Sequence, residues 1–228
     1  MTRQTLIIDA DDTLWENNVY FERVIDQFIE FVNHQHYSRE QVRQVLNQIE
    51  RVNAAVYGYG SATFTRNLQE AFRRLAAAPI SDRELDQVAG LAGGITRQPL
   101  EVIEGVPATL EYLAERHKLV LFTKGDEEEQ RGKLRRSGLA RFFSESLVVR
   151  EKDEGTYRRV TADLEADPAG TWMIGNSPRS DVNPALAAGL NAVWVPHSAT
   201  WVLEQEQLRG GPGRLVVVAR FAELRDIF

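Results

Sequence analysis

Residues 5–13 read Thr-Leu-Ile-Ile-Asp-Ala-Asp-Asp-Thr. The apolar run Leu6–Ile8 is typical of a short strand buried in a parallel sheet. Three carboxylates, those of Asp9, Asp11 and Asp12, follow it at once. Ligands of open α/β sheets bind at the carboxyl ends of the strands, and a divalent cation would offset the repulsion among these anions. The alternative is that the later carboxylates only cap a following helix.

The rest of the chain shows two patterns of apolar residues. Residues 18–96 carry apolar side chains at a spacing of three to four, which predicts helices throughout. Capping-box patterns at Ser38 and Ser81 predict the starts of the second and fourth of these helices. From residue 100 onward, short apolar runs alternate with helical stretches. The expected strands are Leu119–Phe122, Leu147–Val149, Trp172–Ile174, Ala192–Val195 and Leu215–Val218, and the expected helices lie near Glu127–Ser137, Thr156–Ala166 and Asp181–Ala188.

The alternating pattern predicts an α/β fold, because strands that alternate with helices form a parallel sheet covered on both faces. The first strand belongs with this pattern. We therefore expect a Rossmann-like parallel sheet core in three α/β/α layers, formed by residues 1–15 and 100–228. An all-helical cap domain is expected as an insertion over residues 16–99.

Composition excludes some classes of protein. The chain has 228 residues, no cysteine and a formal net charge of −6. An acidic balance argues against a nucleic-acid partner, which usually meets a basic face. No apolar stretch approaches the ~20 residues that a membrane span needs. A chain without cysteine suits a reducing compartment, so a cytoplasmic location is the expectation. The oligomeric state stays open.

Polar or reactive side chains recur at the carboxyl ends of the expected strands. Each is common alone, because a threonine after a strand is usually a turn residue and a single lysine is usually solvated. Their joint appearance at one edge of a sheet is the stronger indication of a site. These residues are Asp9, Asp11, Thr123, Lys124, Lys152, Asn176 and Asp181.

In these positions the chain resembles the haloacid dehalogenase superfamily, whose members are mostly phosphatases. Residues 9–13, Asp-Ala-Asp-Asp-Thr, match the opening motif of the family, and Thr123 after a strand matches the second motif. Lys152 matches the third motif. Residues 175–181, Gly-Asn-Ser-Pro-Arg-Ser-Asp, match the fourth. The helical block between the first two motifs is similar to one of the family's cap types.

The resemblance implies a hydrolase that releases phosphate from a small-molecule phosphate ester through an aspartyl-phosphate. Asp9 would be the nucleophile, and Asp11 would act first as a general acid and then as a general base. Thr123 and Lys124 would bind phosphoryl oxygens. Lys152 would balance their charge and fix Asp9.

The resemblance also implies Mg²⁺ as the cofactor. The Asp9 side chain, the Asp11 backbone carbonyl and a residue of the fourth motif, Asn176 or Asp181, would hold the ion. The family usually has an acidic residue where this chain has Asn176, so the ligand there is neutral. Asp12 stands where many relatives have glycine, and we expect a capping or salt-bridge role for it.

Several alternatives stay open. A 2-haloacid dehalogenase of the superfamily would lack an acid at position 11, because halide leaves without a proton, so Asp11 favours ester hydrolysis. A phosphomutase would keep both carboxylates, and a catalytically silent binding protein is a further alternative. Substrate choice is expected to lie with the cap, where Trp15 and Tyr59 could stack on a base or sugar. Each could instead simply pack in a core.

Overall fold

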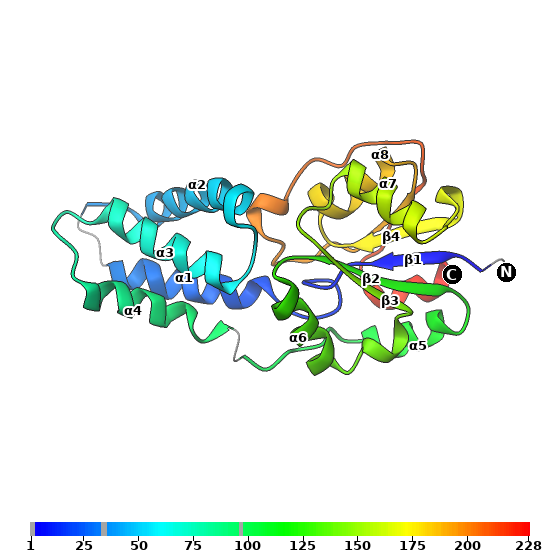
Figure 1. Ribbon diagram of the computed structural model, residues 1–228, viewed down its shortest axis with the longest axis horizontal. Helices are drawn as coiled ribbons and strands as arrows, with labels where there is room; N and C mark the ends of the chain where they lie inside the picture. The colour runs from blue at the N-terminus through cyan, green and yellow to red at the C-terminus, as the bar shows by residue number, and fades with distance from the viewer. Residues whose placement is uncertain (1–2, 33–35, 96–97) are drawn as a thin grey trace. The chain divides into compact units, whose positions relative to one another are not determined.

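The chain forms two compact units (Figure 1). The structure, a computed structural model, describes residues 3–32, 36–95 and 98–228. One unit is an α/β unit, made of the chain up to Asn18 and from Leu100 onward. The other is a helical unit, Val19–Pro99, inserted into the first.

The first strand lies inside a parallel sheet, as predicted. In the described part of the chain the strand order is β3-β2-β1-β4-β5-β6, and all neighbours are parallel. The order runs outward from β1 in both directions, which is the doubly wound arrangement with a switch point at the end of β1. The strands are β1 (Thr5–Ile8), β2 (Lys118–Lys124), β3 (Glu145–Val149), β4 (Thr171–Gly175), β5 (Asn191–Trp194) and β6 (Leu215–Val217).

Helices of the α/β unit differ in how well the sequence predicted them. α6 has the predicted bounds. α7 begins two residues early, because the Asp153 side chain accepts a hydrogen bond from the Thr156 N–H and caps it. α5 was not predicted from the sequence, although Pro107 in its first turn is a typical start signal. The bounds are α5 (Val106–Ala114), α6 (Glu127–Ser137), α7 (Glu154–Asp163) and α8 (Asn183–Ala187).

Alternate side chains of β1 point to opposite faces of the sheet. Leu6 and Ile8 pack in a core cluster with residues of α5 and α6, whereas Ile7 packs in a second cluster with residues of α7 and α8. Figure 1 shows these two pairs of helices on opposite sides of the sheet. All three side chains are completely buried, and each contributes roughly 1.5–3 kcal/mol to folding. The predicted α/β class is confirmed.

The helical unit has its own core. Both predicted capping boxes are present, since the Ser38 and Ser81 hydroxyls accept hydrogen bonds from the N–H groups three residues later. Phe28, Leu46 and Leu68 come from three different helices and are fully buried in one cluster. The helices are α1 (Asn18–Val32), α2 (Arg39–Tyr57), α3 (Ser61–Leu75) and α4 (Asp82–Ala92).

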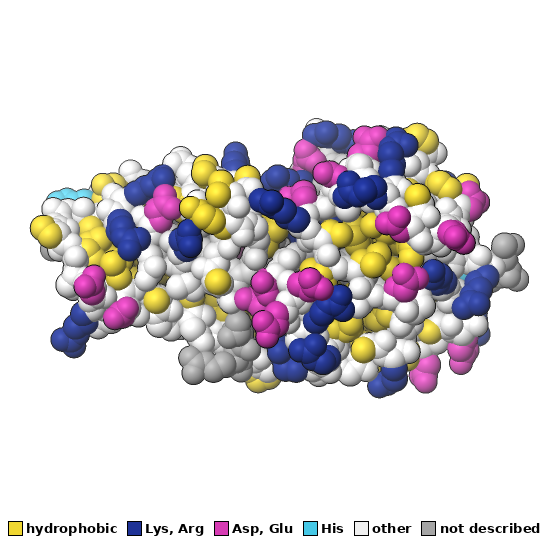
Figure 2. All heavy atoms as spheres, in the orientation of Figure 1, with side chains coloured by type: hydrophobic (Ala, Val, Ile, Leu, Met, Phe, Trp, Pro, Cys, Tyr) yellow, Lys and Arg dark blue, Asp and Glu magenta, His cyan; other side chains and the backbone are white. Residues whose placement is uncertain are grey.

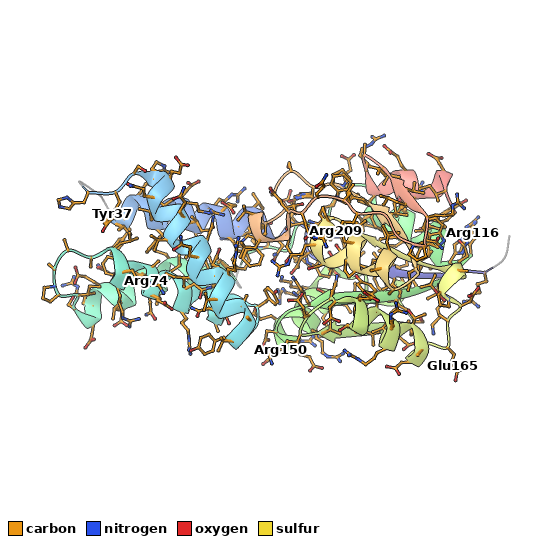
Figure 3. The ribbon with its side chains drawn as sticks, turned by 90° about the horizontal axis from the view of Figure 1, so that it is seen from above. Tyr37, Arg74, Arg116, Arg150, Glu165 and Arg209 are labelled. Carbon is orange, nitrogen blue, oxygen red and sulfur yellow. The ribbon has the colours of Figure 1, made fainter. Side chains whose placement is uncertain are left out.

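The carboxyl ends of the strands define one edge of the sheet. Arg150, which follows β3, lies at this edge, whereas Arg116 and Glu165, which precede β2 and β4, lie at the other end of the unit (Figure 3). Acidic and basic side chains are interspersed on the face seen in Figure 2. None of the helices in the described ranges combines the length and apolar character needed to cross a membrane.

Candidate active site

Four adjacent strands bring the predicted residues to one sheet edge. Asp9 follows β1 directly, Asn176 follows β4 directly, and Thr123 lies near the end of β2. Lys152 lies three residues beyond β3. These four strands are neighbours in the sheet, so residues far apart in the sequence meet around the end of β1.

A buried ammonium group joins two buried carboxylates. Lys152 Nζ lies 2.5 Å from Asp9 Oδ1 and 2.8 Å from Asp181 Oδ1, and its side chain is 1% exposed. Burial raises the pKa of Asp9 to about 7; the charge of Asp181 adds to the rise and Lys152 opposes it. Although burial lowers the pKa of Lys152, the charges of Asp181 and Asp9 outweigh it and raise that pKa. One buried ammonium group thus faces two buried carboxyl groups.

Thr13 connects Asp9 to the fourth motif. Its Oγ1 lies 3.0 Å from Asp9 Oδ2 and 3.3 Å from Asn176 Oδ1, so both oxygens turn toward the same hydroxyl. Carboxylate and amide oxygens are the ligands that Mg²⁺ prefers. The surplus of negative charge on Asp9 and Asp181 also suits a divalent cation. The donor set therefore fits the metal that the family resemblance implies.

Both oxygens of Asp181 are engaged within the protein. Oδ1 accepts a hydrogen bond from Lys152, and Oδ2 accepts one from the backbone N–H of Ser177 at 2.9 Å. The carboxylate packs so closely on Gly175 that a Cβ atom there would collide with it. These contacts favour Asp181 as the residue that holds Lys152, and Asn176 as the metal ligand of the fourth motif.

Three donors hold the Asp11 carboxylate. Lys133 Nζ lies 2.8 and 2.9 Å from its two oxygens, Gln130 Nε2 lies 2.8 Å from Oδ2, and Trp15 Nε1 lies 2.7 Å from Oδ1. Burial opposes ionisation of Asp11, but Lys133 and these hydrogen bonds outweigh it and keep the pKa of this carboxyl below its ordinary value. Asp11 is therefore an ionised acceptor in this arrangement.

Sequence reasoning missed Lys133 and Gln130 as site residues. They lie three positions apart on α6, a spacing that puts both on one helix face. This spacing was the signal in the sequence that could have identified the two residues as neighbours on one helix face. The i,i+4 spacing on this helix would pair Lys133 with Glu129, and it gives no hint of Asp11, which lies 122 residues away in the sequence.

Asp12 caps a helix. Its φ of 59° lies in the left-handed region that glycine adopts most easily, which accounts for the glycine of many relatives. Its Oδ1 accepts hydrogen bonds from the N–H groups of Asn17 and Asn18, at 2.9 and 3.0 Å, where α1 begins. Burial raises the pKa of Asp12 to about 6. These contacts match the capping role expected from the sequence.

Lys124 contacts protein carboxylates at the predicted phosphate site. Its Nζ lies 2.5 Å from Glu204 Oε1, 2.9 Å from Ser180 Oγ and 3.4 Å from Glu151 Oε1. Burial opposes ionisation of Glu204, but Lys124 outweighs it and lowers the pKa of that carboxyl. Glu204 thus balances the charge of Lys124 within the protein, and phosphate binding by Lys124 stays a prediction. The sequence could not identify Glu204, which lies 80 residues away.

The remaining predicted residues have different surroundings. Thr123 is 2% exposed and lies beside the chain that leaves β1, since Leu121 pairs with Ile8. Trp15 is completely buried in the core of the α/β unit. Its complete burial favours the second of the two roles considered for it, packing in a core, over stacking on a substrate. Tyr59 lies in the loop between α2 and α3 of the helical unit, where it is partly buried.

Comparison with known proteins identifies relatives. A family model described as haloacid dehalogenase-like hydrolase matches residues 4–189. The phosphoserine phosphatase of Thermus thermophilus is 28% identical over 171 residues, which cover 67% of this chain and 65% of that protein. This chain thus spans slightly less than two thirds of that relative. The N-acylneuraminate-9-phosphatase of Rattus norvegicus is 21% identical over 206 residues, with 86% of this chain and 83% of that protein covered.

Solved structures share the fold. A haloacid dehalogenase-like family hydrolase from Xanthomonas campestris has a TM-score of 0.83 and 30% identity, with 99% of this chain and 94% of that chain covered. YfnB from Bacillus subtilis, solved bound to magnesium, has a TM-score of 0.66 and 17% identity over 100% and 99% of the two chains. A 2-haloacid dehalogenase from Pseudomonas syringae has a TM-score of 0.62 and 19% identity over 99% and 98%. The last two show the fold alone.

Proposed function

Because the chain belongs to the haloacid dehalogenase-like hydrolases, we propose that it is a phosphatase for a small phosphate monoester. The observation that carries the proposal is the buried pair of Asp9 and Lys152 at the end of the central strand, with a second carboxylate, Asp11, two residues further on. The similarity to two phosphatases supports the same reaction class.

In the first step an Asp9 oxygen attacks phosphorus. An Asp9–phosphorus bond forms, the bond from phosphorus to the alcohol oxygen breaks, and that oxygen takes a proton from Asp11. The ammonium of Lys152, 2.5 Å from Asp9, balances negative charge on the transferred group. The buried hydroxyl of Thr123 supplies a hydrogen bond to a phosphoryl oxygen.

In the second step water attacks the phosphorus of the acyl phosphate. Asp11, now ionised, takes a proton from the water, and inorganic phosphate and the free Asp9 carboxylate are released. The contact of Asp11 with Lys133 suits the second step, because it stabilises the ionised form. The first step needs a protonated Asp11, so this carboxyl must leave Lys133 when a substrate binds.

Two oxygen ligands for Mg²⁺ come from side chains, those of Asp9 and Asn176. The family resemblance adds the backbone carbonyl of Asp11. When bound, the ion would offset the repulsion between the carboxylate nucleophile and the phosphate. Asp181 fixes Lys152 instead, since both of its oxygens accept hydrogen bonds from protein groups.

The chemistry at position 11 separates the alternatives. Dehalogenation needs no acid for the leaving halide, so Asp11 favours ester hydrolysis. A phosphomutase would use both carboxylates, but it would return the phosphoryl group to an organic acceptor. A silent binding protein would release no phosphate at all.

The test measures phosphate release from a panel of monoesters that includes phosphoserine and a sugar phosphate, with and without Mg²⁺. We expect Mg²⁺-dependent release that D9N reduces at least about 1,000-fold, since it removes the nucleophile. D26N, which changes an exposed carboxylate of α1, is the matched control. Full activity of D9N, or release of halide from a 2-haloacid in place of phosphate, would overturn the proposal.

A further inference from the structure

The side-chain amide of Asn176 lies between two threonine hydroxyls. Its Oδ1 is 3.3 Å from Thr13 Oγ1, which itself lies 3.0 Å from Asp9 Oδ2. Its Nδ2 is 2.9 Å from Thr200 Oγ1. Asn176 is only 6% exposed, so these neighbours decide which end of the amide faces Asp9.

The proton of the Thr200 hydroxyl determines the orientation. Thr200 Oγ1 lies 2.8 Å from the carbonyl oxygen of His197. A carbonyl has no proton to give, so the hydroxyl must donate this hydrogen bond. Its oxygen is then an acceptor toward Asn176, and only the N–H end of the amide can meet it. An amide turned the other way would place two acceptor oxygens against each other at Thr200. The Thr13 hydroxyl has one proton for Asp9 Oδ2 or Asn176 Oδ1 and can also accept, so it fits either orientation and Thr200 makes the choice.

The turn that carries Thr200 is anchored on several sides. The backbone N–H of Thr200 also donates to the His197 carbonyl, at 3.1 Å. Asn18 Nδ2 donates to the Ala199 carbonyl at 2.8 Å, and Gln205 Nε2 donates to the Thr200 carbonyl at 3.0 Å. These contacts hold the hydroxyl of Thr200 in place, so it is an organised acceptor rather than a freely rotating group.

We propose that Thr200 is a positioning residue that turns the Asn176 oxygen toward Asp9 and so allows a neutral side chain to serve as a cation ligand. The inference rests on the proposed function in one respect, the assignment of Asn176 as a Mg²⁺ ligand. Only the oxygen end of an amide binds a hard cation, so the choice of end matters. A carboxylate at position 176 would have two oxygens and would need no such choice.

This difference gives a test that separates positioning from simple closure of the turn. T200V removes the hydroxyl and keeps the shape of the side chain. If Thr200 selects the amide end, T200V weakens Mg²⁺ binding in the chain that has Asn176. In the N176D variant the same substitution leaves Mg²⁺ binding unchanged. A role in holding the turn alone would act equally in both backgrounds.

The experiment titrates Mg²⁺ into the full chain by isothermal titration calorimetry. We expect T200V to weaken Mg²⁺ binding about tenfold, as for other residues that orient a metal ligand. T200S should stay within about twofold of the unchanged chain, and T200V should change N176D by less than about twofold. T171V is the matched control, because the Thr171 hydroxyl donates to the Asp167 carbonyl at the opposite end of β4.

Two controls keep the inference distinguishable from the proposed function. If N176A weakens Mg²⁺ binding and T200V does not, the positioning role is overturned while Asn176 stays a ligand. If N176A binds Mg²⁺ as tightly as the unchanged chain, the ligand assignment falls and the inference falls with it. Equal losses from T200V in both backgrounds would also overturn it. Thermal unfolding without Mg²⁺ checks that each variant folds, and T200A replaces T200V if the latter does not.

Discussion

Lys133 Nζ lies 2.8 Å from Asp11 Oδ1 and 2.9 Å from Asp11 Oδ2, and both side chains are less than a quarter exposed. The pair joins α6 to the loop after β1. Its charge complementarity holds the second carboxylate of the proposed active site in the ionised form. Lys133 therefore bears on proton transfer without needing to touch the phosphate.

The first prediction concerns the pH dependence of catalysis. K133M removes the ammonium group whose charge lowers the pKa of Asp11 against the effect of burial, so this pKa rises. Formation of the phosphorylated enzyme needs protonated Asp11, and this form is lost as pH rises through that pKa. The alkaline fall of kcat/KM for an aryl phosphate should therefore move to higher pH. R131M changes an exposed residue of the same helix and should leave the pH profile of kcat/KM unchanged. Identical pH profiles for K133M and R131M would contradict the prediction.

A second prediction concerns the buried ion pairs. K152M leaves the carboxylates of Asp9 and Asp181 without their shared ammonium and should lower the free energy of unfolding by about 3–5 kcal/mol at pH 7. K118M breaks the ion pair of Lys118 with Glu145, whose side chains are 32% and 44% exposed. It should lower the free energy of unfolding by only about 0–1 kcal/mol. Urea unfolding measures both. A loss of equal size in the two variants would show that burial does not set the cost.

The pair of Lys124 and Glu204 predicts an acid-dependent stability. The pKa of Glu204 lies below its ordinary value of 4.5 in the folded chain, so the folded state binds fewer protons than the unfolded state. The stability that Glu204 contributes is fully present above pH 4.5 and is lost as pH falls through the lower folded value. E204Q should be about 1–3 kcal/mol less stable at pH 7, and the difference should shrink below pH 4.5. Urea unfolding at a series of pH values tests this, and a difference that is independent of pH would be the contrary result.

The close packing of Gly175 on Asp181 gives a fourth prediction. A methyl group at position 175 would collide with the Asp181 carboxylate, so G175A should cost about 1–3 kcal/mol and displace the residue that holds Lys152. Both the kcat and the melting temperature of G175A should be lower than those of the unchanged chain. G90A is the matched control, because Gly90 lies inside α4 with open space at its Cβ position. That variant should gain roughly 0.5–1 kcal/mol.

Local patterns predicted much of this fold. The burial of Leu6–Ile8, the bounds of α6 and both capping boxes depend on residues near in sequence, and the structure has all of them. The positions of Asp9 and Lys152 followed from a family motif and a strand end. Their contact adds geometry to that prediction.

The sequence did not predict which residues contact the site residues in the tertiary structure. Gln130 and Lys133 contact Asp11 across 119 and 122 residues, and no spacing rule connects such positions. For Trp15 the sequence left two roles open for a related reason. An aromatic residue beside a site can stack on a ligand or fill the core, and only packing decides between the two.

Asn18 is the residue at which the chain leaves the α/β unit for the helical one. Its backbone N–H donates to Asp12, and its side chain donates to the carbonyl of Ala199, one residue before Thr200. The exit is thus tethered to both the first motif and the turn beside Asn176. Since both bonds lie within the α/β unit, the first residue of α1 is held beside the proposed metal-binding residues by this unit itself.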